Sequence, residues 1–263
     1  MKPSVSFVKI GQHSIRYLEA GNSKKTIVLL HGLGASAERW LPIMPYLSSK
    51  YRVIVPDIIG FGYSDKPVTN YTIKFFMEFL SNFLDQMSIE KTMMVGSSLG
   101  GRILIDYAIY HQNIEKVVLV SPAINDESSP ALQSYIQAAL HPAFEDVKKA
   151  FAMISGENDK VDDEIIIEFI NRMNLPNSKM AFLATLMGLK KEIITQEKLA
   201  QLVTPTLLVW GKEDQVIPIS NADKFNGFVK NFRYHIMDGC GHAPFAEKPE
   251  LFSKIMLEFL KEK

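Results

Sequence analysis

The sequence predicts an α/β fold with a mostly parallel central sheet, helices on both faces and a helical insertion. Short, continuous apolar runs alternate with stretches of helical periodicity along most of the 263 residues. The apolar runs lack the polar alternation of strands with one solvated face, so both faces of the sheet should be covered. The alternation stops over residues 124–204, where helical periodicity continues without a convincing strand.

The predicted strands begin with a hairpin. Residues 4–10 and 14–20 alternate polar and apolar side chains, with Gly11 near the turn, so we expect an exposed antiparallel edge. The next five predicted strands are continuous apolar runs: residues 26–30, 51–55, 91–95, 117–120 and 206–210. A last run, residues 231–237, precedes a glycine-flanked loop.

Helical stretches lie between these strands. Apolar residues recur at helical spacing over residues 36–47, 72–87, 99–110 and 249–260. Strand and helix in alternation imply right-handed crossovers, and ligands of such sheets bind beyond the carboxyl ends of the strands. We therefore expect the chemistry on the turns that lead from strand to helix.

Two domains follow from this pattern: a core of residues 1–123 and 205–263, and a helical cap, or lid, of residues 124–204. The cap has two amphipathic faces that need a partner surface: Leu132, Tyr135, Ile136, Ala139 and Leu140 in one, and Ile165, Ile166, Phe169, Ile170 and Met173 in the other. The simplest arrangement folds the cap over the carboxyl edge of the sheet, with a pocket between the two.

Composition excludes several classes of partner. The chain has 29 Lys and Arg residues and 29 Asp and Glu residues, so its formal net charge is zero. It therefore has no net electrostatic field that would attract nucleic acid or an anionic membrane. No apolar run approaches the roughly 20 residues that span a bilayer, and the N-terminal segment lacks the apolar centre of a secretory signal. The single cysteine, Cys240, excludes an internal disulfide and a cysteine-based metal cluster. We therefore expect a cytoplasmic protein, and the oligomeric state stays open.

A nucleophile is predicted at Ser98. The segment Gly96-Ser97-Ser98-Leu99-Gly100 follows an apolar run and opens a predicted helix, which is the setting of a nucleophile elbow. Such a turn strains the backbone of the nucleophile, so small residues are needed two positions before it and two after it. Ser98 has glycine at both positions and Ser97 does not, which favours Ser98. The alternative is a glycine-rich turn that contains serine incidentally.

A serine hydroxyl needs a base within hydrogen-bond reach and a third group that orients the base. Chains with such an elbow supply nucleophile, acid and base in that order. His242, in the glycine-flanked loop after the last predicted strand, is the expected base. Asp214, in the loop after residues 206–210, is the expected acid, and Asp126 is its competitor. The other histidines fit surface, strand or loop positions: His13, His31, His111, His141 and His235.

The oxyanion formed by serine attack needs two preorganised N–H donors, each worth about 3 kcal/mol in the transition state. The amide of Leu99, directly after the nucleophile, is one expected donor. The other is the amide of Leu33, in the loop of residues 31–34 that follows a predicted strand. His31 is expected to hold that loop. Cys240 lies close to the base but has neither an elbow nor an oxyanion loop, so a thiol nucleophile is disfavoured.

The chain resembles the capped α/β-hydrolase family over nearly its whole length outside residues 124–204. Four segments carry the resemblance: residues 31–34, 56–65, 96–101, and the pair 211–218 and 241–247. The resemblance implies an α/β-hydrolase fold in three layers, acyl-enzyme chemistry and no cofactor, and we expect no metal site. Relatives that are haloalkane dehalogenases or epoxide hydrolases carry aspartate at the elbow, where this chain has Ser98.

The loop of residues 57–65 is also similar to that of meta-cleavage-product hydrolases, which split carbon–carbon bonds with a serine triad. Those enzymes usually present a cap arginine to an anionic dienol acid and carry an aromatic residue after the catalytic histidine. By motif spacing this chain has Phe169 in the first place, with Arg172 three residues further on, and Ala243 in the second. Both departures favour an uncharged ester as the small-molecule substrate.

We therefore expect a carboxylesterase that cleaves esters of small to medium apolar acyl groups through an acyl-enzyme. Carbon–carbon bond hydrolysis is the first alternative. The second is a ligand-binding protein of this fold with little turnover, and the complete set of Ser98, Asp214 and His242 argues against it.

Overall fold

The computed structural model describes residues 2–124, 128–156 and 161–262, and its strands form one mixed sheet. The eight strands of this described part lie in the order β1-β2-β4-β3-β5-β6-β7-β8. Their bounds are β1 Ser4–Ile10, β2 His13–Ala20, β3 Thr26–Leu30, β4 Arg52–Pro56, β5 Thr92–Ser97, β6 Ile114–Val120, β7 Thr206–Gly211 and β8 Phe232–Met237. Strand β2 is antiparallel to β1 and β4, and every other pair is parallel. The predicted mostly parallel sheet is confirmed, with the hairpin at one edge.

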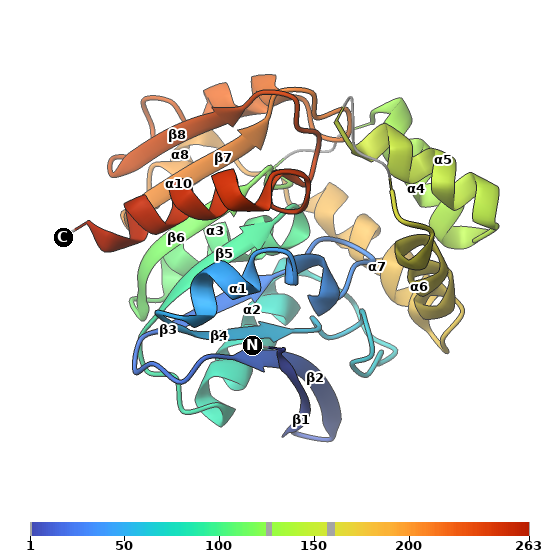
Figure 1. Cartoon of the computed structure of the whole chain (residues 1–263), viewed down its shortest axis with the longest axis horizontal. Coiled ribbons are helices and arrows are strands. Elements are labelled where there is room, and N and C mark those ends of the chain that lie inside the picture. The colour runs from blue at the N-terminus through green and yellow to red at the C-terminus, as the bar shows by residue number, and fades with distance from the viewer. Residues whose placement is uncertain (1, 125–127, 157–160, 263) are drawn as a thin grey trace.

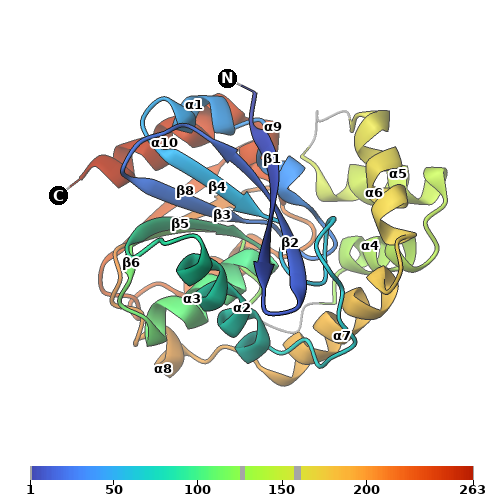
Figure 2. The same cartoon turned by 90° about the horizontal axis from the view of Figure 1, so that it is seen from below.

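Helices cover both faces of the sheet, as the continuous apolar strands require (Figure 2). Helices α2 (Ile73–Gln86) and α3 (Leu99–Tyr110) cover one face, and α1 (Met44–Ser48) and α10 (Pro249–Lys261) cover the other. None of the helices formed by residues 2–124, 128–156 and 161–262 is long and apolar enough to cross a membrane.

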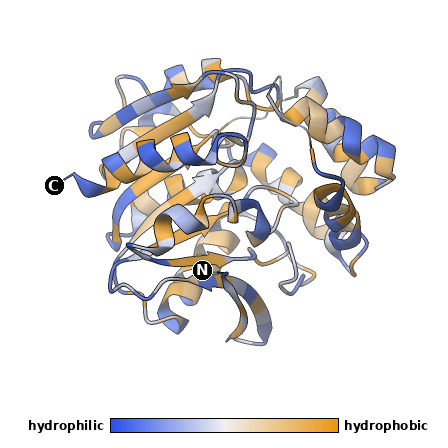
Figure 3. Cartoon of the chain, in the orientation of Figure 1, coloured by the Kyte–Doolittle hydropathy of each residue, from blue (hydrophilic) through white to orange (hydrophobic). Residues whose placement is uncertain are grey.

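The strand period of two divides the apolar residues between two cores. In β3, Val28 and Leu30 pack on the side of α2 and α3, while Ile27 and Leu29 pack on the side of α1 and α10. Figure 3 shows apolar residues along the central strands, whereas helix α10 carries both polar and apolar residues. The sheet is therefore a rigid layer between two cores, which fixes the ends of its strands.

The helix expected over residues 36–47 is wrong as a single element. The structure has a 3-10 helix, Ala37–Trp40, and the short α1 instead. Proline interrupts the segment, because it lacks the amide donor that a helix interior uses. Pro45 lies at the start of α1, where no donor is needed. The helices expected over residues 72–87, 99–110 and 249–260 are confirmed to within one residue at each end.

The segment between β6 and β7 contains helices and connecting loops, and no strand, in its described part. It contains α4 (Pro130–Leu140), α5 (Phe144–Ile154), α6 (Asp163–Met173), α7 (Ser178–Lys191) and α8 (Gln196–Leu199). Figure 1 shows α4 to α7 gathered beside the sheet, on the side toward which the parallel strands point. The division into a core of residues 1–123 and 205–263 and a cap of residues 124–204 stays a prediction.

An aromatic cluster holds these helices together. Rings from α4, α5, α6 and α7 meet with centroids 5.1 to 6.1 Å apart, and they belong to Tyr135, Phe151, Phe169 and Phe182. The two amphipathic faces expected in this segment therefore pack against each other. The hydroxyl of Tyr135 also donates a hydrogen bond of 2.7 Å to the carbonyl of Leu33 in the core.

Candidate active site

The turn between β5 and α3 has the strained geometry of a nucleophile elbow. Ser98 has φ 52° and ψ −112°, a conformation that serine rarely adopts. A Cβ added at Gly96 would lie 2.5 Å from the backbone of Gly100, and one added at Gly100 would lie 2.4 Å from the carbonyl of Leu30. Both positions therefore have room only for glycine. Ser97 belongs to β5, so the strained residue is Ser98.

His242 and Asp214 form a hydrogen-bonded pair beyond the ends of β8 and β7. The Nδ1 atom of His242 lies 2.8 Å from Oδ2 of Asp214. The other carboxylate oxygen, Oδ1, accepts hydrogen bonds of 2.9 Å from the amides of Val216 and Ile217. The Asp214 side chain is 0% exposed, so its carboxylate is shielded from water and accepts three hydrogen bonds, one from the ring and two from amides. A donating Nδ1 leaves Nε2 of His242 as the proton acceptor.

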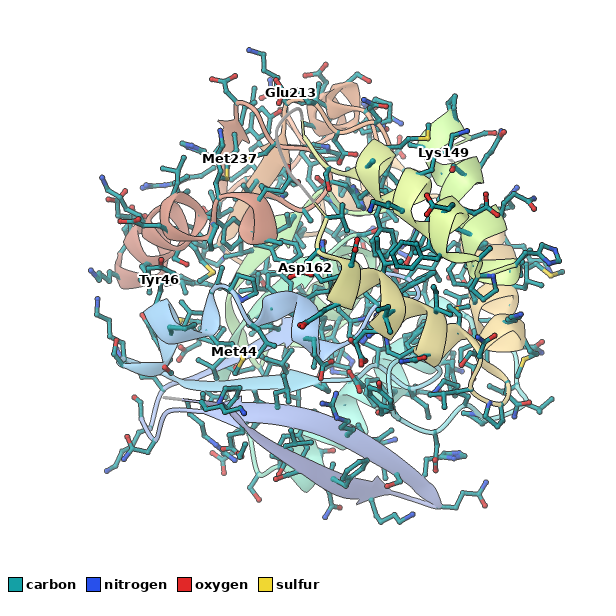
Figure 4. The ribbon with its side chains drawn as sticks, turned by 45° about the vertical axis from the view of Figure 1, so that its right-hand side comes forward. Met44, Tyr46, Lys149, Asp162, Glu213 and Met237 are labelled. Atoms are coloured by element: carbon teal, nitrogen blue, oxygen red, sulfur yellow. The ribbon has the colours of Figure 1, made fainter. Side chains whose placement is uncertain are left out.

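The parallel register brings the candidate residues to one edge of the sheet. Leu30 pairs with Gly96, Ser97 with Val120, and Val120 with Val209. The loops after β3, β5, β7 and β8 therefore start at similar heights. Figure 4 shows Met237 at the end of β8 and Glu213 in the loop after β7, with Lys149 on α5 and Asp162 directly before α6.

The loop after β3 lies against the elbow. A Cβ added at Gly32 would lie 3.8 Å from the Oγ atom of Ser98. Within the described residues, the amides of Leu33 and Leu99 donate no hydrogen bond, so both are available to an anion near Ser98. The roles predicted for these two amides stay predictions.

His31 has the loop-holding contacts expected of it. Its Nδ1 atom donates to the carbonyl of Gly32 at 2.8 Å, and its Nε2 atom accepts from the amide of Ile58 at 3.0 Å. Burial lowers the pKa of His31, which keeps the ring neutral and its Nε2 atom an acceptor. The ring therefore ties the loop after β3 to the loop after β4.

Ser98 is half-buried, and its hydroxyl is not hydrogen-bonded to the His242 ring in the structure. Hydrogen bonds of catalytic groups are often long before substrate binds, and they tighten in the complex. The predicted triad therefore requires this hydrogen bond to form as substrate binds. Ser98, Asp214 and His242 stay the predicted nucleophile, acid and base.

Two alternative site residues were considered from the sequence, and the structure describes only one of them. Asp126, the alternative acid, lies outside the described residues. Cys240 is fully buried, and its amide donates to the Glu213 carboxylate at 2.9 Å. No three His, Cys, Asp or Glu side chains of residues 2–124, 128–156 and 161–262 gather closely enough to hold a metal ion.

Two contacts around the site, and the burial of one charged side chain, were not expected from the sequence. Tyr135 reaches from α4 to the carbonyl of Leu33, and burial raises its pKa, so the phenol keeps the proton it donates. Glu247 binds the amides on either side of His242. Arg172 is buried, with its side chain 6% exposed. The only sequence signals were an aromatic residue on an amphipathic face and a glutamate shortly after the predicted base.

The comparison with protein families decides the assignment of the chain. The family described as alpha/beta hydrolase fold matches residues 25–148 and 150–249. The chain belongs to this α/β-hydrolase family. The predicted family resemblance is therefore confirmed, and so is the predicted fold.

Individual relatives of this family differ in what their names say. A 2-hydroxy-6-oxo-6-(2'-aminophenyl)hexa-2,4-dienoic acid hydrolase from Metapseudomonas resinovorans is 29% identical, over 98% of this chain and 91% of that protein. The crystal structure of a serine hydrolase involved in carbazole degradation, the CarC enzyme, superposes with a TM-score of 0.86 and 28% identity, covering 98% of both chains. A bacterial membrane phospholipase A superposes with a TM-score of 0.87 and 26% identity, covering 98% of this chain and 86% of the other.

Proposed function

We propose that this α/β hydrolase is a serine hydrolase that works through an acyl-enzyme, with Ser98 as nucleophile, His242 as base and Asp214 as the orienting acid. The observation that carries the proposal is the buried His242–Asp214 hydrogen bond, at the same sheet edge as the strained Ser98. Such a pair supplies what a serine hydroxyl lacks at neutral pH, namely an oriented base.

The proposed reaction has two steps. Nε2 of His242 accepts the Ser98 proton as Oγ attacks the carbonyl carbon, and the protonated ring then gives that proton to the leaving group. The amides of Leu33 and Leu99 bind the oxyanion. Water, deprotonated by His242, then attacks the acyl carbon and releases the acid and Ser98. Asp214 stabilises the imidazolium in both steps.

The substrate that we propose is a small-molecule carboxylic ester with a small to medium apolar acyl group. Its support is the aromatic cluster that packs beside the loop of residues 31–34. A Cβ added at Gly34 would lie 2.9 Å from the Tyr135 hydroxyl and 3.0 Å from the ring of Phe182. Phe169 belongs to the same cluster, and by motif spacing it is expected at the place where the similar carbon–carbon hydrolases have arginine.

Carbon–carbon bond hydrolysis is the second candidate, because Arg172 is a buried cation in the helical segment. Its Nε atom has no hydrogen-bond partner among the described residues, and its nearest acidic group, Glu168, lies at 3.7 Å from Nη1. The positive charge of Arg172 also acts on the pKa of His31 and of Tyr135. A buried guanidinium with an unpartnered Nε donor is suited to a substrate carboxylate, and the similar protein from Metapseudomonas resinovorans is named for a dienoic acid.

A substrate panel separates the two candidates. The wild-type protein and Arg172→Met are assayed with p-nitrophenyl acetate and butyrate and with a ring-fission dienol acid. The ester proposal predicts higher kcat/KM for the esters, and little change in it for Arg172→Met. Preference for the dienol acid, lost in Arg172→Met, would establish the second candidate instead. Failure of a fluorophosphonate probe to label the wild-type protein would favour a binding protein without turnover.

We also infer that the protein acts in the cytoplasm. A single cysteine, Cys240, suits a reducing compartment. Fractionation of the source cells with an antibody to the protein tests this location, and recovery in the secreted fraction would contradict it.

A further inference from the structure

The backbone around His242 is held at three consecutive amides. The amide of Gly241 lies 2.9 and 3.1 Å from the two carboxylate oxygens of Glu247. The amide of Ala243 donates to the same carboxylate at 3.2 Å. The amide of His242 itself donates to the carbonyl of Ile154, at the end of α5, at 2.8 Å. One carboxylate and one carbonyl therefore fix the main chain of the proposed base.

Glu247 also binds the helical segment between β6 and β7. Its Oε2 atom accepts a hydrogen bond of 2.7 Å from the amide of Gly156. The two main chains are in close contact here, because a Cβ added at Gly241 would lie 2.3 Å from the carbonyl of Ile154. The end of α5 and the loop of the base therefore form one hydrogen-bonded unit with the Glu247 carboxylate at its centre.

Asp214 alone does not fix the base. Its carboxylate holds the His242 ring at Nδ1, and rotation or displacement of the loop can still move Nε2 relative to Ser98. A carboxylate suits the additional role because both oxygens accept hydrogen bonds from amides. The isosteric amide of glutamine offers one acceptor, and its NH₂ group would face an N–H donor.

We propose that Glu247 is a positioning residue that sets the distance between His242 and Ser98. Through Glu247, this distance depends on the docking of the segment around Ile154 and Gly156. The inference rests on the proposed function, since it concerns the base of that reaction. Glu247 acts through the backbone of Gly241 and Ala243 and does not touch the reacting atoms. Displacement of a catalytic group by about 1 Å costs on the order of 100-fold in rate.

The test compares Glu247→Gln with Glu250→Gln, a change of an exposed glutamate in the first turn of α10. We expect kcat of Glu247→Gln for p-nitrophenyl butyrate to fall on the order of 10- to 100-fold, with KM within threefold of wild type. Fluorophosphonate labelling should slow by a similar factor. Glu250→Gln should match wild type in both measurements. Glu247→Asp, which keeps the charge but is one methylene shorter, provides a second variant.

The ring of His242 gives a readout that is independent of turnover. With ¹³C-labelled histidine, its ε1 resonance is assigned by its loss in His242→Gln. We expect one sharp resonance in wild type and Glu250→Gln, and a broadened or split one in Glu247→Gln. Loss of Tm in Glu247→Gln and Glu247→Asp with unchanged kcat, labelling rate and ring resonance would overturn the positioning role.

The two proposals fail in different ways. A wild-type protein that neither reacts with the fluorophosphonate nor cleaves esters contradicts the proposed function. The His242 resonance in Glu247→Gln then decides the positioning role by itself, with a sharp, unshifted signal counting against it.

Discussion

The Asp214 carboxylate shows how much of the site depends on single hydrogen bonds. It is shielded from water, and its two oxygens have different partners: one orients the His242 ring, and the other accepts the amides of Val216 and Ile217. The amides hold the carboxylate in place, so the ring has one favourable tautomer. In that tautomer Nε2 accepts a proton, as the proposed reaction requires.

Asp214→Asn is therefore expected to keep the fold and lose the reaction. The asparagine oxygen can still accept the two amides, and its NH₂ group then faces Nδ1 of His242 and stabilises the wrong tautomer. We expect kcat for ester hydrolysis to fall by about 10⁴. Asp238→Asn, in the neighbouring loop and with a side chain 79% exposed, serves as the control and should stay within twofold of wild type. Equal activity of both variants would exclude Asp214 as the orienting acid.

Sequence reasoning reached the three candidate residues of the site but not the contacts that position them. Ser98, Asp214 and His242 could be proposed from the sequence because each follows a recognisable strand, and parallel strands end at one edge. Tyr135 and Glu247 carry no such signal, since their contacts depend on how α4 and α9 (Pro244–Glu247) dock on the core. The distance between Ser98 and His242 depends on this docking as well.

Among the elements, helix α3 connects the elbow to the end of the inserted helices. Arg102 and Asp106 form an ion pair of 2.9 Å on α3, and both side chains are only 2% exposed. Lys198, on α8, binds the second oxygen of the same carboxylate. One buried acid is thus shared by two cations from different parts of the chain.

Asp106→Asn should destabilise the protein strongly, because it leaves Arg102 buried without a counter-charge and Lys198 without its partner. Breaking a buried pair from one side costs about 3 to 5 kcal/mol in the free energy of unfolding. Urea denaturation measures this value. Asp85→Asn, at an exposed position on α2, should change it by less than about 0.5 kcal/mol. A similar small change for Asp106→Asn would show that the ion pair does not stabilise the fold.

Element boundaries were predictable where the pattern of apolar residues is regular. Helix α3 and strand β3 match their predicted bounds, because each is a continuous buried run with a clear beginning. The segment of residues 36–47 breaks this rule. Its apolar residues recur at helical spacing, but its prolines divide it into two short helices.

The molecule as a whole is a sheet between two cores. The sheet edge that carries the candidate site also holds the ring of His31, a titratable group that does not belong to the proposed triad. His31 is buried, and its pKa is lowered because burial disfavours the charged form. The unfolded chain therefore binds a proton at His31 more readily than the folded chain does. The stabilising contribution of the neutral ring is complete above the unfolded pKa, about 6.5, and is lost as the pH falls below it.

We therefore expect the free energy of unfolding to fall between pH 7 and pH 5, with a contribution from His31 of up to about 1.4 kcal/mol per pH unit below about pH 6.5. His31→Gln keeps an acceptor for the amide of Ile58 but does not titrate. Urea denaturation of both proteins across this range measures the difference. Identical slopes would show that His31 does not couple stability to pH.

The architecture itself was predictable from sequence, since the alternation of strands and helices allows few topologies. The substrate was not, because one fold serves many reactions and only the side chains around Ser98 choose among them. Phe169 favours an apolar ester, while the buried Arg172 favours an anionic substrate. Which of these two side chains selects the substrate depends on how they pack in the helical segment. The periodicity of apolar residues does not determine that packing.

The most direct measurement maps the reactive residue and its effect on turnover together. Wild-type protein and Ser98→Ala are treated with a fluorophosphonate, digested and analysed by mass spectrometry, and ester hydrolysis is followed in parallel. We predict one adduct, on Ser98, with complete loss of wild-type activity on modification. In Ser98→Ala we predict no adduct, and residual hydrolysis of at most about 10³ to 10⁴ over the uncatalysed rate. An adduct on another residue, or undiminished ester cleavage by Ser98→Ala, would contradict the proposed nucleophile.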